Sequence, residues 1–137
     1  ERRIVALPGV GQFLRRLREA GVPFSVWSST HRENIDTILD VLGFNGWFSG
    51  IVTSEDVKLG KPHPDVFLKA AEKIGRRPER CVVFEDAFVG IEAARAGGMK
   101  VVGVATTHPP GDLTEKVDRV VRRLDELAVA DLLALWK

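Results

Sequence analysis

The stretch CVVFEDAFVGIEAAR, residues 81–95, places a strand, a turn and a helix directly one after another. Its first four residues are apolar and mostly β-forming, which predicts a buried strand. Two carboxylates then interrupt the apolar run, and residues 88–95 have the composition of a helix, which ends at Gly97 and Gly98. A buried strand that leads straight into a helix is the repeating unit of α/β proteins, so this stretch predicts a parallel sheet covered by helices.

Outward from this stretch, helical and strand-like segments alternate along the whole chain. Val10, Phe13, Leu14 and Leu17 have helical spacing, and Gly21 follows them. The other expected helices cover residues 30–42, 64–74 and a leucine-rich tail at 124–135, and the other expected strands cover residues 23–28, 51–53, 100–105 and 118–121. The pattern predicts a single α/β unit over residues 1–137, with a parallel sheet and helices on both faces.

The composition excludes several classes of protein. Hydrophobic residues make up 45% of the chain and charged residues 28%, and the formal net charge is +1. This balance is typical of a soluble globular protein and indicates no nucleic-acid partner and no membrane partner. The one cysteine, Cys81, lies in the apolar run and is expected to be a buried, unpaired thiol. A cytoplasmic location is therefore expected.

Polar residues that follow the expected strands are the candidate site, because the carboxyl ends of parallel strands meet at one edge of a sheet. Ser28, Ser29 and Thr30 lie between a strand and a helix start, where a hydroxyl and free backbone N–H groups can bind an anion. Lys61 is a positive charge between Gly60 and Pro62 in the loop after the next strand. The Thr106-Thr107-His108 segment follows a further strand and is expected to border the site or form a surface loop.

Glu85 and Asp86 place two adjacent carboxylates at the end of the most buried strand. They repel each other unless a cation neutralises them, and Mg²⁺ prefers carboxylate and phosphate oxygens. Together with the anion site and Lys61, they predict a place for a phosphoryl group and its metal. Taken singly, each residue has a plainer explanation: Ser28 as a turn residue, Lys61 as a solvated lysine, and the carboxylate pair as the cap of the next helix.

Three stretches resemble motifs of the haloacid dehalogenase-like superfamily, in the branch of β-phosphoglucomutase and the sugar-phosphate phosphatases. FSVWSST at 24–30 resembles its second motif, GKPHPDVF at 60–67 its third, and FEDAFVGIEAA at 84–94 its fourth. The resemblance extends over essentially all 137 residues. It implies a Rossmann-like core with a parallel sheet and helices on both faces.

The resemblance also implies roles for matching positions. Ser28 would hydrogen-bond a phosphoryl oxygen, and Lys61 would neutralise the nucleophile and the transferring group. Asp86 would bind Mg²⁺, with Glu85 as a further ligand or as a residue behind the ligands. His31 and Arg32 would hold a second phosphate of the substrate, unless they are ordinary residues of a helix surface.

The sequence departs from the family's pattern at its beginning. The family's first motif is Asp-x-Asp on the central strand of the sheet, and its leading aspartate is the nucleophile, but no aspartate precedes Asp36 here. The chain is therefore expected to be the C-terminal part of the core domain, without its first strand and without the cap domain. The missing N-terminal segment or another chain would have to complete the sheet.

The sequence thus predicts part of a Mg²⁺-dependent phosphatase that acts on a small phosphorylated metabolite, such as a sugar phosphate, through an aspartyl-phosphate. A phosphomutase of the β-phosphoglucomutase kind shares the three motifs and remains an alternative. A second alternative is a binding domain or fragment with no catalysis of its own. Without the nucleophile, the isolated 137 residues are expected to be inactive.

Overall fold

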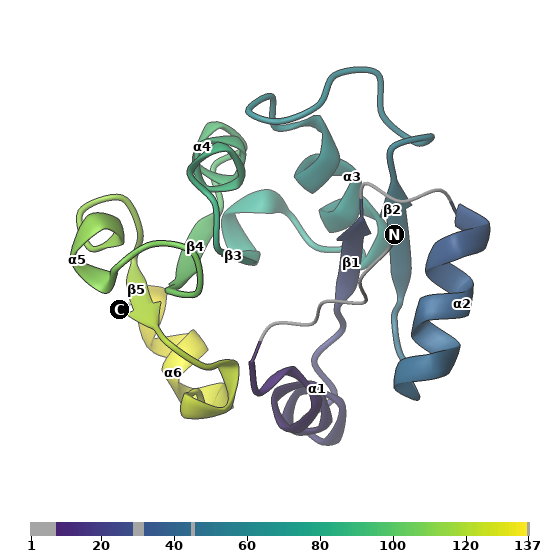
Figure 1. Ribbon diagram of the computed structural model, residues 1–137, viewed down its shortest axis with the longest axis horizontal. Helices are drawn as coiled ribbons and strands as arrows, with labels where there is room; N and C mark the ends of the chain where they lie inside the picture. The colour runs from purple at the N-terminus through teal and green to yellow at the C-terminus, as the bar shows by residue number, and fades with distance from the viewer. Residues whose placement is uncertain (1–7, 29–31, 45, 137) are drawn as a thin grey trace.

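The computed structural model describes residues 8–28, 32–44 and 46–136, and in these ranges helices and strands alternate as expected. Figure 1 shows their arrangement around a layer of strands. The strands are β1 (Ser25–Ser28), β2 (Gly50–Thr53), β3 (Val82–Glu85), β4 (Lys100–Val104) and β5 (Arg119–Val121). The α-helices are α1 (Val10–Glu19), α2 (Arg32–Leu42), α3 (Asp65–Lys73), α4 (Phe88–Ala96), α5 (Pro110–Leu113) and α6 (Val129–Leu133). Short 3₁₀ turns lie at η1 (Pro78–Arg80), η2 (Leu124–Glu126) and η3 (Ala134–Trp136).

All strand pairing is parallel, but the strands form two sheets. One sheet has the order β1-β2, with Ser28 opposite Thr53, and the other has the order β3-β4-β5, with Glu85 opposite Gly103. Within the described ranges no ladder joins β1 to β3, and Figure 1 shows these two strands as the facing edges of the sheets. The break lies at the position where the family resemblance places the first, central strand.

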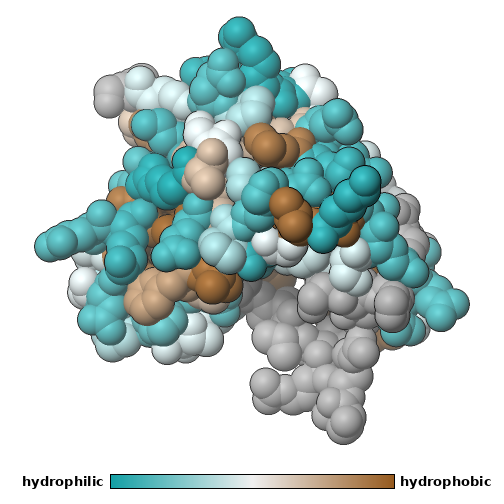
Figure 2. All heavy atoms as spheres, turned by 90° about the horizontal axis from the view of Figure 1, so that it is seen from above, coloured by the Kyte–Doolittle hydropathy of each residue, from teal (hydrophilic) through white to brown (hydrophobic). Residues whose placement is uncertain are grey.

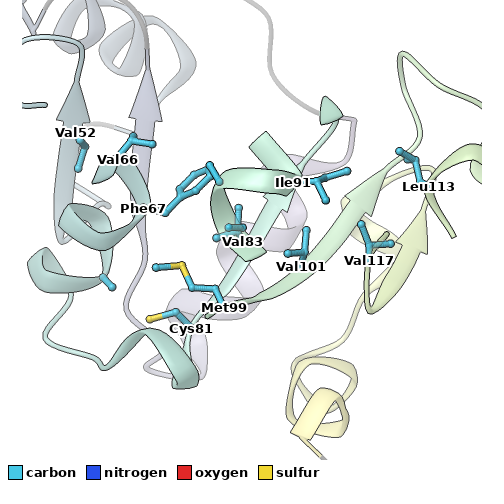
Figure 3. Packing of buried hydrophobic residues seen from close by; sticks show 13 residues of the cluster. Val52, Val66, Phe67, Cys81, Val83, Ile91, Met99, Val101, Leu113 and Val117 are labelled. Carbon is cyan, nitrogen blue, oxygen red and sulfur yellow. The ribbon is translucent and has the colours of Figure 1, made fainter. Parts of the chain in front are cut away.

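Helices cover both faces of the strand layer, as predicted. On one face α3 and α4 pack against the strands, and Figure 3 shows Val52 and Val66 at one end of this cluster and Leu113 at the other. On the other face lie α1, α2 and the C-terminal segment, where the ring of Phe13 meets that of Phe84 edge-on at 5.0 Å between centroids. Both clusters contain residues of both sheets, so apolar packing holds the two sheets together although no strand ladder does.

Glycines end the helices at the positions that the sequence predicts. Gly21 follows α1 with φ 73° and Gly43 follows α2 with φ 80°, a left-handed conformation that other residues rarely adopt. Each terminates its helix and turns the chain toward the next strand. The helices of the described ranges are short, and none of them could cross a membrane.

The tail is not the single helix that its leucines predict. Residues Leu127 and Ala128 have extended backbones between η2 and α6, and the side chain of Leu127 is completely buried. The carboxylate of Glu126 accepts the N–H of Arg123 at 2.8 Å, and that of Asp131 accepts the N–H of Ala128 at 2.8 Å. These two capping bonds begin two separate short helical segments, which is why the periodicity of the leucines misleads.

Candidate active site

Lys61 connects the two sheets at the carboxyl ends of their strands. Its Nζ atom donates a hydrogen bond to Oε2 of Glu85, the last residue of β3, at 3.0 Å. The same ammonium lies 5.6 Å from the ring centroid of Trp27 on β1 and 5.5 Å from that of Phe67 on α3. These distances are within the range of cation–π attraction. The side chain of Lys61 is only 18% exposed, so it is not the solvated surface lysine of the plainer explanation.

Glu85 is held on both of its carboxylate oxygens. While Oε2 accepts the bond from Lys61, Oε1 accepts the backbone N–H groups of Asp86 at 3.1 Å and Ala87 at 3.3 Å. Glu85 therefore fills part of the role expected of a capping residue, since it satisfies N–H groups just before α4. Buried, negatively charged and bonded to an ammonium, it fixes the lysine at this edge of the sheets.

Gly90 makes room for the carboxylate of Glu85. A Cβ atom at position 90 would overlap the side-chain carboxylate of Glu85, which lies directly against the backbone of α4. The backbone of Gly90 is helical, so the glycine is required by this close approach and not by an unusual φ angle. Gly90 lies within the segment that resembles the fourth motif, and a glycine inside a helix is the sequence signal from which this role could have been predicted.

Asp86 lies beside Glu85 but has different partners. Its Oδ2 accepts a hydrogen bond from the hydroxyl of Thr106 at 3.3 Å, and its backbone carbonyl accepts one from the hydroxyl of Thr107 at 2.9 Å. The ring of His108 stacks on that of Phe88, with the centroids 4.1 Å apart. The segment after β4 thus borders the site, which was one of the two interpretations left open by the sequence.

Ser28 ends β1 and is half-buried, next to Trp27 and therefore on the same edge as Lys61. Ser29, Thr30 and His31 lie outside the described residues. Arg32 is the first residue of α2, and its side chain is also outside the description. The structure therefore brings together Lys61 with Glu85 and places the end of β1 beside them.

Asp86 and Glu85 differ in how well they meet the ligand requirements of Mg²⁺. In the described ranges no group of three or more histidine, cysteine, aspartate or glutamate side chains forms a ready-made metal site. Magnesium, however, is usually held by one or two carboxylates and completes its shell with water and substrate phosphate. Asp86 fits that requirement as a carboxylate at the edge of the sheets. Glu85 fits it less well, because Lys61 and two backbone N–H groups already engage its two oxygens.

Comparison with known proteins agrees with this geometry. Residues 1–98 match the family model described as haloacid dehalogenase-like hydrolase. The chain belongs to this family. The matched range contains the three motif-like segments to which Ser28, Lys61, Glu85 and Asp86 belong. The fold has the parallel strands and flanking helices of the family's solved structures.

Two curated relatives are phosphatases. The chain is 42% identical over 124 residues to the chloroplastic 5-amino-6-(5-phospho-D-ribitylamino)uracil phosphatase of Arabidopsis thaliana, and the match covers 90% of this chain and 33% of the relative. It is 43% identical over 82 residues to the fructose-1-phosphate phosphatase of Escherichia coli, covering 60% of this chain and 44% of that protein.

A solved structure of β-phosphoglucomutase from Clostridium difficile superimposes with a TM-score of 0.81 at 27% identity. The superposition covers 95% of this chain and 56% of the mutase. The matches with these three proteins cover 33%, 44% and 56% of their lengths, so this chain spans only part of each of them.

Proposed function

We propose that these residues form the C-terminal part of the core domain of a Mg²⁺-dependent phosphatase that acts on a small phosphorylated metabolite, of the sugar-phosphate class. The observation that carries the proposal is the 3.0 Å contact between Lys61 and Glu85 at the carboxyl edge of the strands, directly beside Asp86. Family membership supports the phosphatase chemistry, and the named phosphatases among the relatives support the substrate class.

In this proposal the positive and polar groups bind the transferring phosphoryl group. Lys61 neutralises negative charge on it and on the attacking carboxylate, while its bond to Glu85 keeps it in place. Ser28 donates its hydroxyl to a phosphoryl oxygen, and Ser29 and Thr30 contribute N–H or hydroxyl groups at the start of the next helix. Charge stabilisation of this kind is usually the largest catalytic contribution to phosphoryl transfer.

Asp86 is proposed as the carboxylate that holds Mg²⁺, and Glu85 as its neighbour behind the ligands. When bound, Mg²⁺ neutralises charge on the phosphate oxygens of the substrate. One carboxylate oxygen of Asp86 would bind the ion, while Oδ2 accepts the hydrogen bond from the hydroxyl of Thr106. His31 and Arg32 are proposed to bind a second phosphate or another polar group of the substrate, in line with the family resemblance.

In this proposal the attacking carboxylate is an aspartate outside residues 1–137, since no aspartate precedes Asp36 within them. That carboxylate would form a bond to phosphorus while the bond from phosphorus to the substrate's oxygen breaks, and the alcohol would leave with a proton. Water would then hydrolyse the aspartyl-phosphate to phosphate and the free carboxylate. The isolated 137 residues should therefore release no phosphate above the uncatalysed rate.

A β-phosphoglucomutase-like phosphomutase is the second candidate, and the superposition on the Clostridium difficile mutase favours it. A non-catalytic binding domain is a third possibility in a different class, and the pairing of a shielded lysine with a buried carboxylate speaks against it. Such a pair is costly to bury, and a domain kept only for its fold has no need of it.

The test uses the full-length gene product with Mg²⁺ and a panel of sugar phosphates and other phosphorylated metabolites. Release of inorganic phosphate that Lys61→Met abolishes and Lys58→Met preserves would support a phosphatase, since Lys58 is an exposed lysine of the same loop. Conversion of one sugar phosphate to its isomer in phosphorus NMR spectra, without release, would identify a mutase. Binding of the panel compounds without either reaction would contradict both enzymatic proposals.

A further inference from the structure

Two neighbouring threonines converge on a single acidic residue. The hydroxyl of Thr106 donates to Oδ2 of Asp86 at 3.3 Å, and the hydroxyl of Thr107 donates to the backbone carbonyl of Asp86 at 2.9 Å. One bond therefore restrains the side chain and the other restrains the peptide to which it is attached. Among the described residues, a hydrogen bond engages Oδ2 of Asp86 and none engages Oδ1.

The backbone brings these hydroxyls to Asp86 by a sharp turn. Strand β4 runs parallel to β3, and the N–H of Ala105 still bonds to the carbonyl of Val121 on β5 at 2.8 Å. The N–H of Thr106 then bonds back to the carbonyl of Val104 at 2.9 Å, which folds the chain across the end of β3. As a result, Thr106 and Thr107 point at a residue of the neighbouring strand's end.

A third contact anchors the far side of the same segment. The ring of His108 stacks on that of Phe88, with an interplanar angle of 25°, and Phe88 is the first residue of α4, two positions after Asp86. The segment from Thr106 to His108 is thus tied to both sides of Asp86. A carboxylate on a turn would otherwise sample several rotamers.

The hydroxyls of Thr106 and Thr107 contribute little to the stability of the fold. Both residues are exposed, and a typical hydrogen bond contributes only about 0.5–1.5 kcal/mol to folding. Two exposed hydroxyls that both bond to the proposed metal-binding residue are better explained by that residue's task. Groups that orient a metal ligand typically change metal affinity by about 10-fold to 100-fold when they are removed.

We propose that Thr106 and Thr107 are positioning residues that hold the carboxylate of Asp86 in its Mg²⁺-binding orientation. The inference rests on the proposed function, because it takes Asp86 as the metal-binding carboxylate. It assigns a task to the segment after β4, outside the three motifs by which the family was recognised.

The test is a calorimetric titration of the full-length protein with Mg²⁺ alone, in the absence of substrate. Thr106→Val and Thr107→Val remove the hydroxyls at almost constant shape, while Thr106→Ser and Thr107→Ser retain them. Thr114→Val is the matched control, because Thr114 is an exposed threonine just after α5 whose hydroxyl donates to the carbonyl of Pro110 at 2.9 Å, and among the described residues no hydrogen bond joins it to Asp86.

The valine variants should each weaken Mg²⁺ binding about 10-fold with a nearly unchanged melting temperature without metal, and the serine and Thr114 variants should bind as the unmodified protein does. Asp86→Asn distinguishes the positioning role of the threonines from the metal-binding role of Asp86. If Asp86→Asn abolishes binding but both valine variants bind normally, the positioning role is wrong and the metal-binding role of Asp86 stands. If Asp86→Asn also binds normally, the proposed metal site itself is wrong.

Discussion

The ammonium of Lys61 lies 3.0 Å from the carboxylate of Glu85, and both side chains are largely shielded from water. Lys61 belongs to the loop that follows β2 in the first sheet, and Glu85 ends β3 in the second sheet. The pair therefore joins two sheets that no strand ladder connects in the described ranges. It also fixes a positive charge at the edge where the phosphoryl group is proposed to bind.

Replacement of Lys61 by Met should affect both activity and stability. Phosphate release by the full-length protein should fall at least about 100-fold, because the charge that stabilises the transition state is lost. The free energy of unfolding should fall by about 1–3 kcal/mol, because Glu85 loses its charged partner in a shielded position. Urea denaturation measures the second effect, and the exposed Lys58→Met is the control for both.

A double-mutant cycle of Lys61→Met with Glu85→Gln measures how much of the stability loss comes from the unpaired carboxylate of Glu85. In the Glu85→Gln background no carboxylate is left unpaired, so Lys61→Met should cost less stability there than in the unmodified protein. Activity should not return in the double variant, because the positive charge is still missing. Equal stability costs in both backgrounds would show that the pair is not coupled.

Gly90→Ala should be destabilising although alanine is the better helix former. The added methyl group would overlap the carboxylate of Glu85 and force it away from α4. Overpacking of this kind costs about 1–3 kcal/mol, more than the roughly 1 kcal/mol that alanine gains in a helix. Thermal denaturation and the activity of the full-length protein should both show the loss.

Gly111→Ala is the matched control for Gly90→Ala. Gly111 also lies in a helix with an ordinary φ angle, and a Cβ there would meet no atom within 4 Å. This control should be neutral or slightly stabilising. The cost of Gly90→Ala should also shrink when Glu85 is replaced by Ala, and an unchanged cost in that background would contradict the proposed overlap.

Much of the fold could be predicted from the sequence because its signals are local. The apolar run before Glu85 and the helical segment after Asp86 predict β3 and α4 almost residue for residue. The meeting of Lys61 and Glu85 followed from a general property of parallel sheets, whose carboxyl ends share an edge. Neither prediction required knowledge of long-range packing.

Other features depend on contacts that no local pattern encodes. The approach of the Trp27 ring to the ammonium of Lys61 depends on how the two sheets pack together. The bond from Thr106 to Asp86 depends on the direction of one turn after β4. The tail was predicted as one helix because the caps that divide it, Glu126 and Asp131, look like ordinary charged residues of a helix surface.

The thiol of Cys81 should make stability fall in alkaline solution. Burial raises the pKa of this thiol above its ordinary value of 9.0, and the thiol donates a hydrogen bond to the carbonyl of Arg77. At neutral pH the thiol is protonated in both states. Above its ordinary pKa the unfolded chain loses the proton while the folded chain keeps it, so stability falls as the pH rises, by up to about 1.4 kcal/mol per pH unit.

Comparison with Cys81→Ala isolates this contribution from all other titrating groups. The variant should be less stable at pH 7 by about 1 kcal/mol, because it leaves a small cavity at a buried site. The difference in free energy of unfolding between the variant and the unmodified protein should shrink between pH 8 and pH 10.5. Urea denaturation at each pH measures it. A constant difference across that range would show that the thiol titrates equally in both states.

Arg16→Lys should loosen the C-terminal segment. The Nη1 atom of Arg16 donates to the backbone carbonyls of Asp125 at 2.7 Å and Leu127 at 2.8 Å, which holds η2 and the extended residues after it against α1. A lysine ammonium lies on a flexible stem and lacks the rigid planar fork of arginine, so it should not hold both carbonyls in the same geometry.

The expected cost of Arg16→Lys is about 1–2 kcal/mol, together with faster hydrogen exchange in residues 124–136. The neighbouring Arg15 is exposed, and Arg15→Lys should leave both measurements unchanged. Faster exchange throughout the chain would instead indicate that the bond supports the whole fold. Faster exchange confined to residues 124–136 would show that the hydrogen bonds of Arg16 stabilise this segment, which has no continuous helix to stabilise it.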